Sequence, residues 1–229
     1  MFTRILFAAV LSGLAAGIAF TGLQSVKVLP LIWQAETYES AGGPAPGPAG
    51  AHAHADTDSW APADGAERLA YTLLANVLIG IGFALLLCAG FALHGETDWR
   101  KGLVWGLLGY AVFQLAPAFG LPPELPGMKA AAVEARQLWW VGTVAATAAG
   151  LGLAILARQG LWKAAGVALV ALPHIVGAPH PGSHQAGALP AELAAAFVSA
   201  SLVTNLIFWM LLGALSACAF QRLSARMAT

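Results

Sequence analysis

Long apolar segments alternate with short polar clusters along this chain. Six segments stay apolar for roughly the 20 residues that a helix needs to cross the bilayer core. The third and fifth are short and end in proline, so five crossings are the alternative to six. The segments are about 5–33, 69–93, 102–119, 138–157, 161–178 and 192–220. The pattern predicts an all-α, polytopic membrane helical bundle that forms a single transmembrane domain over residues 1–229.

The first apolar segment has some features of a secretory signal peptide. Arg4 precedes an apolar run, as in the positively charged start of such a peptide. The run continues past Phe20 without a clean small-residue cleavage site, which favours a retained membrane anchor.

Composition agrees with a membrane protein and gives no support to an enzyme. The chain is 59% hydrophobic and 10% charged, whereas soluble domains carry about 25% charged residues. Lys+Arg and Asp+Glu balance at 11 each, and no basic stretch suggests nucleic acid. The chain has no GxxxxGK[ST], HExxH or GxSxG motif, so neither ATP hydrolysis nor a nucleophilic site is indicated.

The distribution of Lys and Arg predicts the orientation in the membrane. Alternating six crossings places seven of these residues on one side and four on the other, which puts the richer side and both termini in the cytoplasm. The seven are Arg4, Arg100, Lys101, Arg158, Lys163, Arg222 and Arg226; the four are Lys27, Arg68, Lys129 and Arg136. Trp139 and Trp140 then fall at the outer interface, where tryptophan commonly anchors helices. We expect a multi-pass protein of a bacterial inner membrane.

The predicted outer face is rich in carboxylates and imidazoles. All Asp, Glu and His residues fall there except Glu96, Asp98 and His94. Such a surface suits cation capture. Acidic outer loops are also common for another reason, because Lys and Arg are kept inside.

Residues 41–66 read as a flexible external loop rich in Gly, Pro, His and Asp. The loop carries His52 and His54, followed by Asp56 and Asp58. Imidazole and carboxylate groups suit divalent cobalt, nickel and zinc, and on a mobile chain they would bind metal weakly and exchangeably. The competing interpretation is a solvated linker.

Two of the apolar segments end in runs of proline and glycine. The third contains Pro117 and then Gly120, and the fifth contains Pro173 and then Gly177. Proline breaks the helical hydrogen bonds, and freed carbonyls at membrane depth are tolerated where they line a cavity. Interrupted segments of this kind in both halves of a chain indicate a transport site.

Three histidines follow the break in the fifth segment and are the strongest metal-ligand candidates. His174, His180 and His184 lie within eleven residues, although Pro181 and Gly182 prevent a simple helical pair. A compact turn would bring two or three imidazoles together; the alternative is interfacial histidines without a ligand role. Their convergence with Glu124 or Glu192 would favour a metal site.

Polar residues inside the spans are costly and need a reason. Asn76, Gln114 and Asn205 either form hydrogen bonds between helices or line a polar path for an ion. Small-residue pairs also predict close packing. They are Gly13 with Gly17, Gly102 with Gly106, and Ala146 with Gly150.

Several runs across almost the whole chain resemble the CbtA family. They lie at 60–65, 71–76, 113–117, 120–127, 136–140, 172–174, 177–181 and 190–193. The family is known as a probable cobalt transporter subunit associated with cobalamin synthesis, and it is usually described with five spans. The resemblance implies a partner, the small single-span membrane protein CbtB, whose tail carries histidines.

The resemblance and the residues together suggest a non-ATP-hydrolysing subunit of a cobalt uptake transporter. It would bind Co2+ transiently, without a permanent cofactor, and ligand chemistry alone does not separate Co2+ from Ni2+ or Zn2+. The metal path would use Asn76, Gln114, Pro117, Glu124, Pro173 and Asn205. The alternative is a structural or regulatory subunit that binds a partner protein and transports nothing. The sequence is also compatible with a homo-oligomer.

Overall fold

The protein is helical throughout the part that the structure describes. This computed structural model describes residues 1–41, 62–95, 98–181 and 189–226, and no strand occurs among them. Four helices are long and apolar enough to cross a membrane: α1 Phe2–Lys27, α3 Ala66–His94, α6 Val133–Leu156 and α8 Ala191–Arg226. The described residues therefore confirm the predicted all-α class, and these four helices are consistent with a membrane protein.

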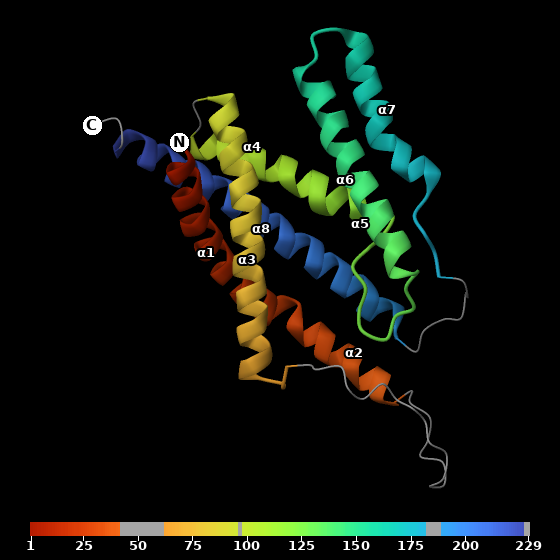
Figure 1. Cartoon of the computed structure of the whole chain (residues 1–229). Helices are drawn as coiled ribbons and strands as arrows, with labels where there is room; N and C mark the ends of the chain where they lie inside the picture. The colour runs from red at the N-terminus through yellow and green to blue at the C-terminus, as the bar shows by residue number, and fades with distance from the viewer. Residues whose placement is uncertain (42–61, 96–97, 182–188, 227–229) are drawn as a thin grey trace, which may run out of the picture.

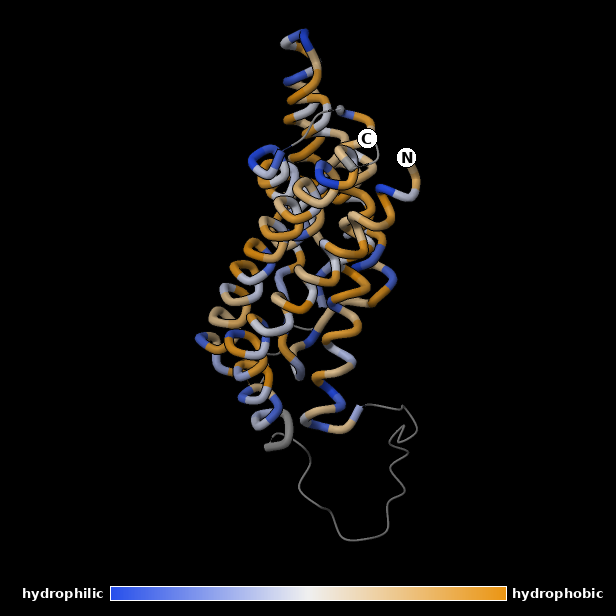
Figure 2. Tube along the Cα trace, turned by 90° about the vertical axis from the view of Figure 1, so that its left-hand side faces the viewer, coloured by the Kyte–Doolittle hydropathy of each residue, from blue (hydrophilic) through white to orange (hydrophobic). Residues whose placement is uncertain are grey.

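Two further apolar segments are shorter. The first comprises α4 Trp99–Tyr110, η1 Ala111–Leu115 and α5 Ala116–Ala118, which follow one another without a break. The second is α7 Gly160–Val176, with 17 residues. The start of α1 and the end of α8 lie at the same end of the molecule (Figures 1 and 2). Six crossings remain a prediction, with four of them carried by helices of membrane length.

The first apolar segment is not one helix, as we had predicted for residues 5–33. α1 ends at Lys27, and α2 (Leu29–Ala41) runs obliquely away from it (Figure 1). Pro30 explains the break, because its ring nitrogen cannot donate to the carbonyl of Val26 and its ring crowds that carbonyl. α2 is held by a small apolar cluster formed by Val28, Ala35, Leu125, Leu193 and Phe197.

Glycines bring the helices of the main bundle into close contact. α1 crosses α3 where Gly13 meets Gly80; a Cβ at Gly13 would lie 2.3 Å from the backbone nitrogen of Ile81. α4 crosses α8 where Gly102 meets Gly213, and a Cβ at Gly102 would lie 2.5 Å from the Gly213 carbonyl oxygen. The predicted small-residue packing is therefore confirmed at both crossings.

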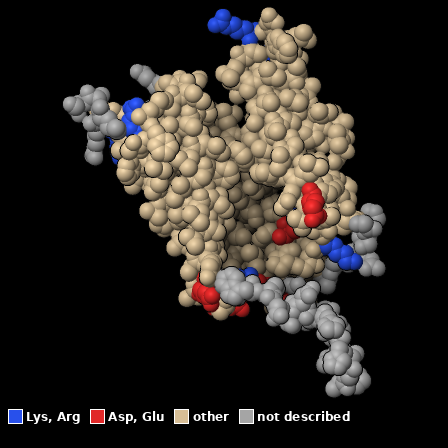
Figure 3. Space-filling model, in the orientation of Figure 1, with Lys and Arg blue, Asp and Glu red and all other residues tan. Residues whose placement is uncertain are grey.

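The bundle of α1, α3, α4 and α8 contains the main hydrophobic core, and the hairpin of α6 and α7 stands beside it (Figure 1). The hairpin has its own glycine contact between Gly150 and Gly166. It meets the rest of the protein mainly through η1 and α5, which pack against α6. The surface is hollowed between the bundle and the hairpin (Figure 3).

The exterior suits a lipid environment. Large apolar side chains face outward along the helices, among them Leu11 (55% exposed) and Val167 (64% exposed). Hydrophilic residues gather at the two ends of the helices (Figure 2). On the face shown in Figure 3, acidic side chains lie in the lower half, and basic side chains lie at the upper ends and at lower right. This distribution is consistent with the predicted acidic outer face.

Candidate functional site

The proline in the third apolar segment reshapes the helix around it. Pro117 cannot donate to the carbonyl of Phe113, and the turn before it widens into the π-helix η1. There, the N–H of Ala116 donates to the carbonyl of Ala111, five residues back. Turns of this kind often mark functional sites because they redirect side chains and loosen the backbone. Gln114 lies within this turn.

The second proline-containing segment ends beside the first. Pro173 lies inside α7, which ends at Val176; Gly177 follows with a φ of +88°, which favours glycine. The indole of Trp139, on α6, fits against Gly120, where a Cβ would lie 2.4 Å from the ring. The same Cβ would lie 2.8 Å from the Cβ of Ala178. The two helix ends, 58 residues apart in sequence (Gly120 to Ala178), thus meet at one tryptophan.

A cavity of about 800 Å³ lies next to this meeting point, between η1, α5, α6 and α7. His174 and His180 both line it. The ring of His174 makes edge contacts with Phe119 and Trp139, with ring centroids 6.1 and 6.0 Å apart. Thr147 also lines the cavity, and its buried hydroxyl finds no hydrogen-bond partner within the described part of the chain. The cavity is otherwise mostly apolar. We call it the histidine cavity.

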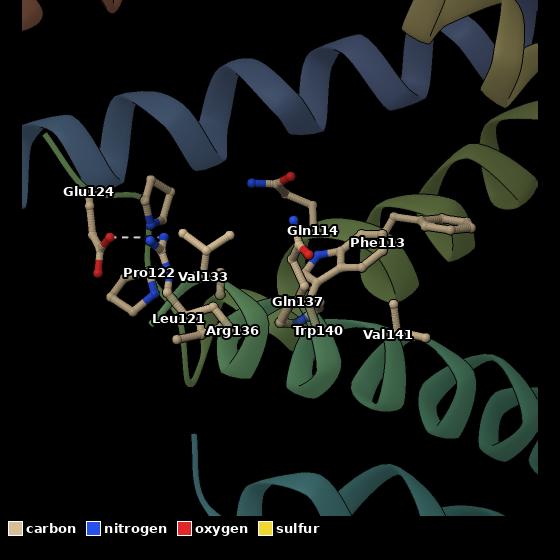
Figure 4. A pocket seen from close by; sticks show the side chains of 13 residues that line it. Phe113, Gln114, Leu121, Pro122, Glu124, Val133, Arg136, Gln137, Trp140 and Val141 are labelled. Atoms are coloured by element: carbon tan, nitrogen blue, oxygen red, sulfur yellow. Dashed lines mark ion pairs between the residues drawn. The ribbon is translucent and has the colours of Figure 1, made fainter. Parts of the chain in front are cut away.

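A second cavity, of about 700 Å³, lies on another face of the contact between η1, α5 and α6. Gln114, Gln137, Glu124 and Arg136 are its polar lining residues, and Figure 4 shows them beside Trp140. Arg136 forms an ion pair with Glu124, with 2.9 Å between Nη2 and Oε2. We call this the glutamine cavity. It shares no lining residue with the histidine cavity.

Asn76 and Asn205, the other two polar residues predicted within the spans, form hydrogen bonds to neighbouring helical residues. The Asn76 amide donates to Thr21 Oγ1 (3.0 Å) and to Gln24 Oε1 (2.7 Å), which ties α3 to α1. The Asn205 amide donates to the carbonyl of Ser201, one turn back in α8. Neither residue lines the histidine cavity or the glutamine cavity.

Comparison with known proteins places the chain in a family. The family model described as "Probable cobalt transporter subunit (CbtA)" matches residues 2–221, which is nearly the whole chain. The chain belongs to the CbtA family. No curated protein and no solved structure matches it. The CbtA description names a transporter subunit rather than an enzyme, and the four apolar helices agree with a multi-pass membrane protein.

Only part of the predicted site can be placed in this CbtA chain. The structure puts His174 and His180 in one cavity, and it puts Gln114, Pro117 and Glu124 in the other. His52, His54, Asp56, Asp58 and His184 lie outside the described residues. Within the described ranges, no group of three or more His, Cys, Asp or Glu side chains could hold a metal ion. The described histidines do not share a cavity with Glu124, which is paired with Arg136.

Several residues of these CbtA cavities were not singled out as site residues from the sequence. They are Arg136, Gln137, Trp139 and Thr147. Trp139 was predicted to anchor at the lipid interface, but its indole nitrogen is buried, with no hydrogen-bond partner in the described ranges. The adjacent polar pair of Arg136 and Gln137 at the start of an apolar helix was the one available signal.

The role of Asn76 can be tested by replacing it with leucine. We expect a modest loss of stability, about 0.6–2 kcal/mol, because hydrogen bonds between membrane helices contribute little each. Cobalt transport by the folded protein should remain close to that of the wild type, since Asn76 bonds to α1 and lines neither cavity. Thermal unfolding in detergent and a transport assay measure the two effects. Transport that disappears in a stably folded variant would instead place Asn76 on the ion path.

Proposed function

We propose that this chain is the membrane subunit through which divalent cobalt enters a bacterial cell. The observation that supports it most directly is the histidine cavity, where two proline-containing helix ends meet and two imidazoles line one space. Imidazole suits Co2+, Ni2+ and Zn2+. Interrupted helices supply carbonyl oxygens where an ion has lost part of its water. His174 and His180 would take the metal from the outer side, with His184 as a further ligand.

The two cavities suggest a route for the ion. From the histidines, the metal would pass the backbone near Pro117 and Pro173, then Gln114 and Glu124 in the glutamine cavity. The sequence also suggested Asn76 and Asn205 for the path, but their described hydrogen bonds favour a role in helix packing, so the proposed route does not pass through them. The loop with His52, His54, Asp56 and Asp58 would concentrate metal before entry.

The membrane potential can drive this transport without ATP. Each elementary charge crossing a membrane gains about 2.3 kcal/mol per 100 mV, so a divalent cation gains about 4.6 kcal/mol. That free energy corresponds to an accumulation of about 10³-fold. Consistent with this, the chain lacks a Walker motif.

We also propose that the chain works with a CbtB-like single-span protein and that its cobalt serves cobalamin synthesis. The family description supports the first point only to the extent that it names a subunit. A homo-oligomer remains compatible with this arrangement.

Reconstitution into lipid vesicles tests the proposal. We expect Co2+ to enter vesicles that contain the purified chain, with its partner if required, when a potassium gradient and valinomycin make the interior negative. Entry should stop when the potential is abolished and should need no ATP. Vesicles with the partner alone serve as the control. If no Co2+ enters with or without the partner, the chain is not a cobalt pathway.

The alternative function is that of a non-transporting structural or regulatory subunit. Two observations favour it: Asn76 is satisfied by α1, and no three-ligand metal cluster occurs among the described residues. In that case, the partner would transport Co2+ alone, and this chain would change only the amount or stability of the partner. The same vesicles distinguish the two functions.

A further inference from the structure

The Glu124–Arg136 ion pair lies where the loop after α5 meets the first turn of α6. Its two side chains are 23% and 33% exposed, so the pair is partly withdrawn from water. The pair therefore joins the proline-rich segment to the α6–α7 hairpin at the edge of the glutamine cavity (Figure 4). Charge-assisted bonds of this kind are about twice as strong as neutral ones.

Charge is sparse in the cavity. Among the described residues that line it, Glu124 is the only carboxylate and Arg136 the only cation. Phe113, Pro117, Trp140 and Val141 make most of the remaining wall apolar. In such surroundings, the interaction between two charges is stronger than in water. The charge of the cation that pairs with Glu124 therefore has a large effect on the interaction energy.

The guanidinium of Arg136 is only partly satisfied where it lies. Nη2 bonds to Glu124, but the buried Nε has no hydrogen-bond partner among the described residues. Gln114 and Gln137 bring neutral amide oxygens into the same cavity (Figure 4). These oxygens are suitable acceptors for a guanidinium that has left Glu124, and they are also suitable ligands for a hard or borderline cation.

We propose that Arg136 is a specificity-determining residue, a built-in cation that a transported metal ion must displace from Glu124. This inference rests on the proposed function. A singly charged ion gains no Coulombic advantage over the guanidinium that it would replace, whereas a divalent ion carries twice the charge. Arg136 therefore excludes Na+ and K+ from the glutamine cavity and admits divalent metal. It also weakens metal binding enough for the ion to leave.

Metal binding to the purified full-length chain in lipid nanodiscs tests this, with CoCl2 as the probe in a calorimetric titration. Arg136→Gln should bind Co2+ at least tenfold more tightly, which is about 1.4 kcal/mol, since one competing charge-assisted bond is removed. In this variant alone, 100 mM Na+ should compete with Co2+. Glu124→Gln should weaken binding by a similar factor, and the double variant should match Glu124→Gln. Arg68→Gln is the matched control, because Arg68 forms ion pairs with Glu36 and Asp64 and lines neither cavity.

A purely structural ion pair predicts no gain in Co2+ affinity when Arg136 is replaced. In that case, Arg136→Gln would lower the melting temperature and would bind Co2+ no more tightly than the wild type, which overturns the inference. If Arg136→Gln does not fold, unchanged Co2+ binding by Glu124→Gln overturns it equally. If either of these results is found while the wild-type protein binds and transports Co2+, the inference fails but the proposed function stands. Wild-type protein that neither binds nor transports Co2+ rejects the proposed function and, with it, the inference.

Discussion

Replacing His174 and His180 together by alanine is expected to lower the rate of cobalt uptake by about tenfold or more. Both imidazoles line the same cavity, and nothing else that the structure describes there is a strong ligand for a borderline metal. Loss of groups that hold or orient a metal commonly costs about 10–100-fold in affinity or activity. The folded amount should stay near the wild-type value, because both side chains are exposed.

The chain offers a matched control for this variant. His94 is also exposed and also contacts a tryptophan, Trp105, but it ends α3 at the opposite end of the molecule. His94→Ala should therefore transport cobalt at the wild-type rate. Uptake is compared at equal membrane abundance, determined by immunoblot. Equal uptake by the double variant and the wild type would remove the histidine cavity from the path.

The second large effect concerns the crossing of α4 and α8. A Cβ at Gly106 would lie 2.3 Å from the carbonyl oxygen of Trp209, which is backbone and cannot move aside as a side chain can. Gly106→Ala should therefore cost several kcal/mol, above the usual range of about 1–3 kcal/mol for overpacking. We expect a large fall in melting temperature, or no monodisperse protein at all, by fluorescence-detected size exclusion.

Gly82→Ala provides the comparison, because it makes the same chemical change within α3. A Cβ at Gly82 would meet no atom within 4 Å. Alanine is favoured over glycine inside a helix by about 1 kcal/mol, so this variant should match or exceed the wild type in stability. If both variants unfold at the same temperature as the wild type, the helices do not cross as described.

The sequence predicts the helices well because their determinants are local. Apolar length and flanking charge locate α3, α6 and α8, and the small-residue pairs identify the faces that pack. The break at Val28 was missed because residues 5–33 were assigned to one span by their overall hydropathy, and hydropathy does not register the one missing hydrogen bond at Pro30.

The site depends on contacts between distant segments and was predicted only in part. Pro117 follows a π-helical turn and Pro173 lies in the last turn of α7, but the sequence did not reveal that Trp139 joins the two helix ends. The pairing of Glu124 with Arg136 likewise depends on how the intervening loop folds back onto α6. Asn76 shows the converse, since an intramembrane amide looks functional until its partners on α1 are known.

Uptake of radioactive cobalt is the most direct test of the account. The host should lack other cobalt importers and should express this chain, CbtB, both or neither, at matched abundance. We expect uptake in cells that contain this chain, with CbtB where it is required, to exceed uptake in cells with CbtB alone or the empty vector. Uptake that is the same with and without this chain would contradict the central claim and would favour a structural or regulatory subunit.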